Sequence, residues 1–200
     1  MNPTKEHITL TSFRLFLQKG YKEVTMSMLV KATGLSKGAF YYYFENKEQL
    51  FCEALNNLFF SIYPFNSELE INPDISFYDY MYKYINNIKK SGEKVRDYLG
   101  NDDHGMGYYR LMLDIANYAT DFRKKIELEN KHELNFWLKI VENGIKRGEL
   151  RNDIDLKLLA NHFQWLQDGI AINSIFSGTT EFLYQNLEKV FVQLYQLIKK

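Results

Sequence analysis

The 200-residue chain has little of several features that would define its chemistry. A single cysteine, Cys52, excludes an internal disulfide and any cysteine cluster that could hold zinc. The 25 lysines and arginines balance the 25 aspartates and glutamates, so no net charge steers the chain as a whole towards an anionic partner. No apolar run approaches the roughly 18 residues of a membrane span, and the N-terminus lacks the apolar core of a signal peptide. We therefore expect a cytoplasmic protein without a membrane partner.

Sequence motifs for catalysis and cofactor binding are also missing. The sequence contains no nucleophile elbow, no Walker loop and no dinucleotide fingerprint. Asp102, Asp103 and His104 are adjacent, but in a loop rich in Asn and Gly such side chains more often face water than bind a metal. The histidines lie far apart and lack the H-E-x-x-H spacing of a zinc enzyme: His7, His104, His132 and His162. We predict no enzymatic activity, no metal site and no cofactor.

Residues 25–50 have the pattern of a helix-turn-helix, in which two short helical segments flank a tight turn. Thr25 is a suitable N-cap for the first helix, and Gly34 can adopt the positive φ that ends it. Ser36 can cap the second helix, and Asn46 can cap a third. A helix-turn-helix commonly places its second helix in the major groove of DNA.

The second of these helices has one buried and one exposed face. Phe40 and Phe44 are four residues apart and share a side of the helix, so we expect both rings to be buried. Two helical turns cannot bury four consecutive rings, so the tyrosines between them should reach the surface at least in part. Gly38 has no side chain and would let the helix N-terminus approach a phosphate. The face that remains for DNA carries Lys37, Ala39, Tyr41 and Tyr42.

This segment resembles the DNA-binding domain of the TetR family of transcriptional regulators. The residues that match the usual pattern of that domain are Thr25, Gly34, Ser36, Lys37, Gly38, Tyr41, Tyr43, Phe44 and Lys47. Val30 and Thr33 replace small alanines, and Ala39 replaces a Thr or Ser whose hydroxyl often touches DNA in the family. The Ala39 methyl could contact a thymine methyl instead. The resemblance implies that the DNA contacts come from Thr25, Ser36, Lys37, Gly38, Ala39, Tyr41, Tyr42, Tyr43 and Lys47.

Charge is distributed unevenly along the chain, in agreement with this reading. Residues 1–50 carry seven lysines and arginines and four glutamates, a net charge of +3, so the rest of the chain carries −3. A basic N-terminal segment, called the head below, followed by an acidic remainder of the chain suits a protein that contacts DNA at one end. Ordinary solvated surface charge would also explain this asymmetry, so the motif is the stronger argument.

The remaining sequence is helical in pattern throughout, so we predict an all-α fold. The N-terminal helix-turn-helix domain of three helices would occupy residues 1–48, and a helical ligand-binding and dimerisation bundle residues 49–200. The segments 108–118 and 121–146 could be two helices or one kinked helix, whereas 64–75 reads as a connector and 92–107 as irregular chain. The other helices beyond the head are expected at 47–63, 76–90, 156–176 and 180–198.

Looser motifs extend the resemblance towards the C-terminus. Residues 147–150 read R-G-E-L, as in the turn that commonly ends a long helix in the family, and Asp168-Gly169 matches a pair in the next helix. In the family the last two helices form a four-helix dimer interface. The residues implied for that interface here are Phe182, Leu187, Val190, Phe191 and Leu194. A core within one chain is the alternative for these side chains.

Aromatic residues are abundant, with 15 Phe, 15 Tyr and 2 Trp. For any one of them a place in the core is the simpler explanation, but together the rings of the central helices could line a site between helices. The candidates for a ligand site are Phe59, Tyr63, Tyr78, Tyr82, Tyr109, Trp137 and Trp165.

The resemblance implies a homodimeric DNA-binding regulator, a repressor that a small apolar or aromatic ligand releases from operator DNA. The effector would favour a dimer whose recognition helices no longer fit successive major grooves, and the fourth helix would transmit the change. The alternative is a ligand-independent DNA-binding architectural or protein-interaction module with the same head.

Overall fold

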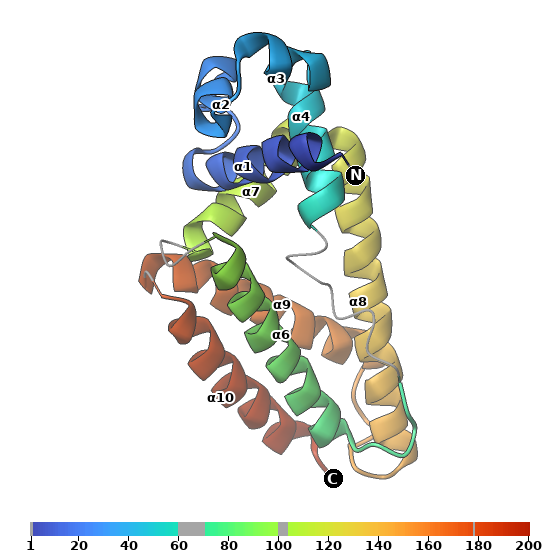
Figure 1. Ribbon diagram of the computed structural model, residues 1–200. Helices are drawn as coiled ribbons and strands as arrows, with labels where there is room; N and C mark the ends of the chain where they lie inside the picture. The colour runs from blue at the N-terminus through green and yellow to red at the C-terminus, as the bar shows by residue number, and fades with distance from the viewer. Residues whose placement is uncertain (1, 60–70, 100–103, 178) are drawn as a thin grey trace. The chain divides into compact units, whose positions relative to one another are not determined.

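The computed structural model describes residues 2–59, 71–99, 104–177 and 179–200, and its regular elements are helices (Figure 1). The all-α prediction is therefore confirmed. The chain divides into two compact units, each described by itself below. Unit 1 comprises Met1–Pro64 and Val95–Ile126, and unit 2 comprises Phe65–Lys94 and Glu127–Lys200. None of the helices in the described ranges is long and apolar enough to span a bilayer.

Unit 1 contains the helix-turn-helix, and the caps expected from the sequence are present. The Thr25 hydroxyl oxygen accepts a hydrogen bond from the Met28 N–H at 3.3 Å, and the Asn46 side chain accepts one from the Gln49 N–H at 2.8 Å. Gly34 has φ 68° and ψ 8°, the left-handed conformation predicted for it. The elements of unit 1 are α1 (Pro3–Lys19), α2 (Met26–Thr33), α3 (Lys37–Tyr43), α4 (Lys47–Ala54), the π-helix η1 (Leu55–Phe59), α7 (His104–Tyr118) and the first turns of α8 (Thr120–Lys146).

Helix α1 is the centre of unit 1 and packs against α2, α4 and α7. The Phe16 ring meets the Phe51 ring edge to face, with centroids 5.0 Å apart. The other fully buried side chains of this core include Ile8, Phe13, Leu29, Phe40, Leu50 and Leu111. This packing holds the short α3 in place, since a seven-residue helix has little stability of its own.

The segment after α4 differs from the prediction of one helix over 47–63. Helix α4 ends at Ala54 and continues as the π-helix η1, whose Leu55 and Phe59 are buried. The Phe59 ring packs edge to face on Phe122 at 5.2 Å. Nothing in the sequence pattern distinguishes this wider turn from an ordinary helical one, and the expected end of the helix lies outside the described residues.

Unit 2 consists of most of α6 (Phe77–Leu99) and α8, with α9 (Leu156–Ser177) and α10 (Thr180–Ile198). Figure 1 shows α10 alongside α6, and a Cβ atom on Gly92 of α6 would collide with the Tyr184 hydroxyl of α10. The Trp137 indole stacks on Phe163 at 4.5 Å in the middle of the core. Helix α6 extends nine residues beyond the predicted end at residue 90. Helices α7 and α8 are separate, with the non-helical Ala119 between them.

The R-G-E-L turn, residues 147–150, follows the end of α8 and forms hydrogen bonds with the start of α6 and with α10. Gly148 has φ 72°, and Leu150 after it is buried. The Glu149 carboxylate accepts hydrogen bonds from the Phe77 N–H at 2.8 Å and the Tyr78 N–H at 3.1 Å, so it caps the N-terminus of α6. The same carboxylate accepts a bond from the Tyr195 hydroxyl of α10 at 3.2 Å.

Candidate nucleic-acid interface and ligand site

The N-terminus of α3 is an exposed set of hydrogen-bond donors. The Ser36 hydroxyl oxygen accepts from the Ala39 N–H at 3.2 Å, which caps the helix and leaves the Ser36 hydrogen available to a phosphate. Ser36, Lys37, Gly38 and Ala39 are all exposed. No atom lies within 4 Å of where a Gly38 Cβ would be, so internal packing does not require a glycine there. Close approach to another molecule is a physical reason for one.

The aromatic residues of α3 divide as the spacing predicted. Phe40 and Phe44 are buried, Tyr41 is partly exposed, and Tyr42 is 83% exposed. The Tyr43 hydroxyl reaches the Asn2 side chain at 3.4 Å, and the Tyr42 ring stands edge to face against the Tyr43 ring at 5.0 Å. Tyr42 therefore projects from the surface with its orientation supported by a half-buried neighbour.

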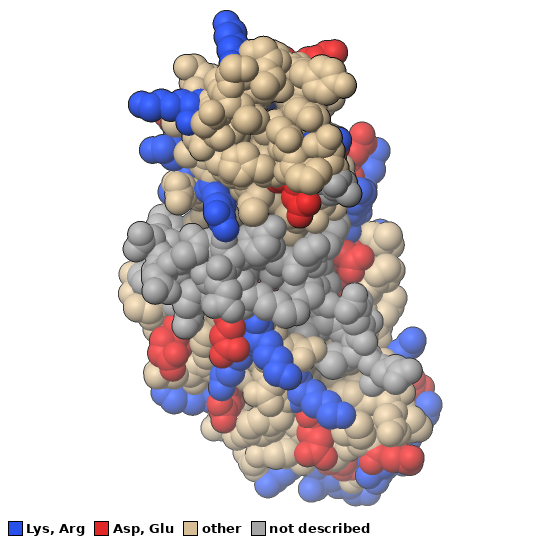
Figure 2. Space-filling model, in the orientation of Figure 1, with Lys and Arg blue, Asp and Glu red and all other residues tan. Residues whose placement is uncertain are grey.

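Lysines of the head differ in what they contact. Lys22, Lys31 and Lys37 are exposed, and the Lys37 ammonium lies 5.8 Å from the centre of the Tyr41 ring. Figure 2 shows lysine and arginine side chains around a largely uncharged surface at the upper end, where α2 and α3 lie. Such a surface can combine phosphate contacts at its margin with base contacts at its centre.

Lys47 has a structural function that the sequence did not indicate. Its ammonium donates to the Tyr21 carbonyl oxygen at 2.7 Å and to the Val24 carbonyl oxygen at 2.8 Å, and it lies 4.2 Å from the centre of the Tyr21 ring. Two of its three N–H donors are therefore used within unit 1. A phosphate contact through the third N–H stays a prediction.

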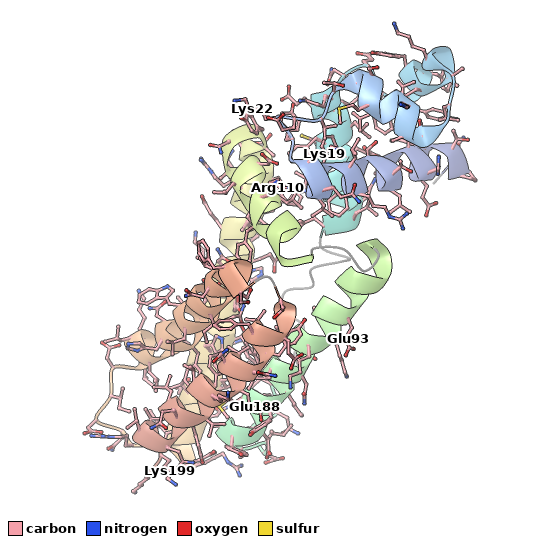
Figure 3. The ribbon with its side chains drawn as sticks, turned by 90° about the vertical axis from the view of Figure 1, so that its left-hand side faces the viewer. Lys19, Lys22, Glu93, Arg110, Glu188 and Lys199 are labelled. Carbon is pink, nitrogen blue, oxygen red and sulfur yellow. The ribbon has the colours of Figure 1, made fainter. Side chains whose placement is uncertain are left out.

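The turn between α1 and α2 is held by α7, also within unit 1. The Asp114 carboxylate accepts from the Tyr21 N–H at 2.7 Å, and the Arg110 guanidinium donates to the Leu17 and Gln18 carbonyl oxygens at the end of α1. Figure 3 labels Arg110 on α7 and Lys19 in the last turn of α1. Burial raises the pKa of Asp114, while the Tyr21 N–H and Arg110 oppose that rise. Sequence reasoning did not place either residue against the turn after α1, because α7 is distant in sequence from the head.

The proposed ligand-site residues are distributed over both units, and the site stays a prediction. Phe59 and Tyr109 belong to unit 1, whereas Tyr78, Tyr82, Trp137 and Trp165 belong to unit 2. Tyr63 lies outside the described residues. Trp165 is 57% exposed on α9, so it does not belong to the core of unit 2, and its place in a ligand site stays a prediction.

The other three candidates in unit 2 have different surroundings. Tyr78 and Tyr82 are half-buried, their hydroxyls 3.3 Å apart, and Tyr82 also reaches Glu188 at 3.4 Å. Their mutual hydrogen bond and burial raise the pKa of Tyr82 to about 12. Trp137 is fully buried, and its indole N–H lowers the pKa of the Tyr84 hydroxyl, although the two groups do not align as a regular hydrogen bond.

Sequence reasoning missed a buried acid on the same face of α8 as Trp137. Glu133 on α8 is only 6% exposed, and the Tyr84 hydroxyl of α6 bonds both its carboxylate and the Gln167 side chain of α9. The spacing of Glu133, Phe136 and Trp137 follows one helical face, so a charged residue in an otherwise apolar stripe was the available signal.

The five proposed dimer residues differ in their burial within one chain, and the interface stays a prediction. Leu187 and Phe191 are fully buried in the core of unit 2, where Phe191 packs on Phe163 at 5.0 Å. Val190 and Leu194 are half-buried, and Phe182 is at the border of exposure. The alternative of a core within the chain is thus right for two of the five residues. The large apolar side chains that α9 and α10 expose are Leu156, Leu158, Trp165, Ile172, Phe176, Phe182 and Leu197.

Comparison with known proteins identifies the head. Residues 8–54 match the model of the family described as bacterial regulatory proteins, tetR family. The chain is 46% identical over 54 residues to the HTH-type transcriptional regulator YerO of Bacillus subtilis, which covers 27% of this chain and 19% of YerO. It is 32% identical over 96 residues to YuxN of the same organism, covering 48% of this chain and 26% of YuxN. The matches thus span about a fifth to a quarter of these relatives.

The whole fold has solved counterparts. A transcriptional regulator from Saccharomonospora viridis, in complex with choline, superposes with a TM-score of 0.69 over 100% of both chains, at 18% identity. Identity this low shows the fold alone. The head, however, carries both the helix-turn-helix geometry and the family match. Through it, residues 8–54 are identified as a DNA-binding domain of the TetR family, whose members are DNA-binding transcriptional regulators, typically repressors, and not enzymes.

Proposed function

We propose that the protein is a cytoplasmic, homodimeric transcriptional repressor that binds operator DNA through α3 and is released from it by a small apolar or aromatic ligand bound in unit 2. The observation that carries the proposal is the exposed surface of α3. Ser36 caps the N-terminus of α3, and Lys37 and Tyr42 are exposed on the same short helix. These side chains are not packed in the core of unit 1, so they are available to DNA.

The individual contacts follow from the positions of the side chains. Lys37 and Tyr41 lie on neighbouring turns and contact phosphate, together with the Ser36 hydroxyl and the third N–H of Lys47. Tyr42 and the Ala39 methyl contact base edges, because Tyr42 projects furthest of the α3 rings. Thr25, the N-cap of α2, and Tyr43, the last residue of α3, complete the interface.

Dimerisation rests on the apolar stripe of α9. Trp165, Ile172 and Phe176 are spaced by seven and four residues, so they share one face of the helix. Phe176 is 84% exposed, and a stripe of large exposed side chains is unfavourable unless a partner covers it. A second copy of the chain would cover it isologously, with Phe182 of α10 at its side.

Binding to DNA duplexes tests the proposal. Lys37→Ala should weaken binding to all sequences and lower the dependence of log K on log salt by about one unit. Tyr42→Ala should reduce the preference for the operator over random DNA more than it reduces binding to random DNA. Equal losses for Tyr42→Ala on both duplexes would exclude Tyr42 from base contacts.

A ligand screen separates a regulated repressor from an architectural module. Thermal stability would be measured against a metabolite library, with and without operator DNA. A regulated repressor should show antagonism, in which a ligand that stabilises the protein weakens DNA binding over the same concentration range. DNA binding that no stabilising ligand weakens would support the ligand-independent module.

A further inference from the structure

Helix α7 approaches the end of α1 closely within unit 1. A Cβ atom on Gly107 of α7 would lie 2.9 Å from the Leu17 carbonyl oxygen of α1. Gly20, which follows α1 with φ 82°, would carry a Cβ atom 2.8 Å from the Arg110 side chain. A backbone oxygen cannot move aside as a side chain can, so α7 lies this close to α1 only because residue 107 is a glycine.

Polar side chains of α7 bind the backbone at this contact. Arg110 and Asp114 are four residues apart, so they share one face of the helix. The Arg110 guanidinium donates to the Leu17 and Gln18 carbonyl oxygens, which the end of a helix leaves without an intrahelical partner. The Asp114 carboxylate accepts from the Tyr21 N–H at 2.7 Å. Helix α7 therefore fixes the last turn of α1 and the start of the turn that follows it.

Tyr21 connects α7 to the start of α4. Its ring contacts the Tyr118 ring of α7, with centroids 4.8 Å apart, and the Phe51 ring of α4 at 4.7 Å. Its carbonyl oxygen is one of the two acceptors of the Lys47 ammonium, which also lies 4.2 Å from the centre of the Tyr21 ring. A displacement of Tyr21 would therefore move the groups that hold Lys47.

The two hydrogen bonds of Lys47 set the direction of its third N–H. An ammonium group has three N–H bonds in a tetrahedral arrangement, and donating two of them to carbonyl oxygens stops rotation about the Cε–Nζ bond. The third N–H is then held in one orientation. A donor that is oriented before binding loses less conformational entropy when it contacts a phosphate.

We propose that Asp114 and Arg110 are positioning residues for DNA binding. By fixing the turn at residues 20–24, they orient the third N–H of Lys47 towards a phosphate, without contacting DNA themselves. This inference rests on the proposed function, since it accounts for the Lys47 contact in that proposal. It also extends the DNA-binding part of the chain beyond residues 8–54 to include α7.

Salt titrations of the full-length protein on a mixed-sequence DNA duplex test the inference. Asp114→Ala removes the acceptor of the Tyr21 N–H, so it should weaken binding about tenfold and lower the dependence of log K on log salt by about one unit. Asp114→Asn keeps an oxygen that can accept this bond, so its affinity and its slope should stay close to those of the wild type. Asp121→Ala is the charge-matched control, because this carboxylate at the start of α8 is 97% exposed, and it should leave both values unchanged.

A variant carrying both Asp114→Ala and Lys47→Ala shows whether the two residues act on one contact. Its slope should equal that of Lys47→Ala alone, because the same phosphate contact is lost in each. A mere loss of stability would reduce the amount of folded protein without changing the slope, so the slope separates positioning from folding. Arg110→Ala should lower the slope equally and replaces Asp114→Ala if that variant does not fold, with Lys124→Ala as its charge-matched control.

A wild-type slope for a folded Asp114→Ala or Arg110→Ala variant would overturn the inference. Two separate slope reductions in the double variant would also overturn it, as would an Asp114→Asn variant that binds as weakly as Asp114→Ala. The proposed function is tested separately on operator DNA. Duplex binding without these effects rejects only this inference, whereas a protein that shows them but protects no operator rejects only the proposed repressor. A wild type that binds no duplex rejects both.

Discussion

The ammonium of Lys47 lies 2.7 Å from the carbonyl oxygen of Tyr21 and so joins the start of α4 to the turn after α1. Lys47→Ala would leave this carbonyl and that of Val24 without their charged donor. We expect unit 1 to lose about 2 kcal/mol of stability, the usual contribution of a hydrogen bond to a charged group. Thermal unfolding would measure the loss.

Lys37→Ala is the matched control for that experiment, because Lys37 is exposed and bonds no carbonyl in the described ranges. Its melting temperature should match that of the wild type. Salt titrations of DNA binding then show whether Lys47 also contacts phosphate through its third N–H. An unchanged salt slope for Lys47→Ala would restrict this residue to its structural function.

Gly38→Ala separates folding from DNA binding. A Cβ at this position meets nothing within 4 Å, so the stability should stay the same or rise by up to about 1 kcal/mol. Operator affinity should fall at least tenfold if the N-terminus of α3 approaches the sugar-phosphate backbone. Fluorescence anisotropy and thermal unfolding on the same sample give both values. Undiminished affinity would place this end of the helix away from DNA.

Phe176→Asp tests the dimer surface. The side chain is exposed, so the variant should fold with wild-type helicity but sediment as a 23.8 kDa monomer and lose specific operator binding. Phe191→Asp is the contrasting case, since a charge in the core of unit 2 should cost more than about 4 kcal/mol and unfold that unit. A dimer formed by Phe176→Asp at micromolar concentration would exclude the α9 stripe as the interface.

Stability should depend on pH through Glu133. Its pKa is raised to about 7 by burial, so the folded protein holds this proton more tightly than the unfolded chain, with its ordinary value of 4.5. The resulting stabilisation is complete below pH 4.5 and is lost as the pH rises to about 7, a change of about 3 kcal/mol. Denaturant titrations of wild type and Glu133→Gln should diverge over this interval, the variant being the less pH-dependent. Parallel curves would show that Glu133 titrates normally.

Glu149→Ala tests the R-G-E-L turn. The carboxylate caps two N–H groups of α6, and removing a cap of this kind typically costs about 1 kcal/mol. Chemical denaturation should show that loss, and hydrogen exchange should show it first at Phe77 and Tyr78. Protection unchanged at these two amides would mean that water replaces the carboxylate without cost.

The head was predictable from sequence because local signals determine it. Caps at Thr25, Ser36 and Asn46, the left-handed Gly34 and the spacing of Phe40 and Phe44 act over four residues or fewer, and each is present in the structure. The functions assigned to Lys37 and Tyr42 depend on DNA and stay predictions. The domain boundary at residue 48 also stays a prediction.

Contacts over long sequence separations were not predictable. The partners of Lys47 lie 26 and 23 residues away, and Tyr21, the partner of Asp114, lies 93 residues away. The partners of Glu149 lie 72, 71 and 46 residues away, and no spacing rule reports such pairs. In α10, apolar residues cover more than one face, so the pattern could not tell the core residue Phe191 from an interface residue. A tyrosine or tryptophan in a helix is equally compatible with core, surface and ligand site, so the pattern did not predict that Trp165 is exposed.

Footprinting on the DNA upstream of the protein's own gene tests the central claim most directly. The proposed dimer, with one α3 per subunit, should protect two symmetry-related half-sites whose centres are about 10 base pairs, or a multiple of that, apart. Tyr42→Ala should lose this pattern while retaining binding to random DNA. A wild-type protein that protects no defined site there, or whose footprint Tyr42→Ala reproduces, would contradict the assignment of α3 as the helix that recognises DNA.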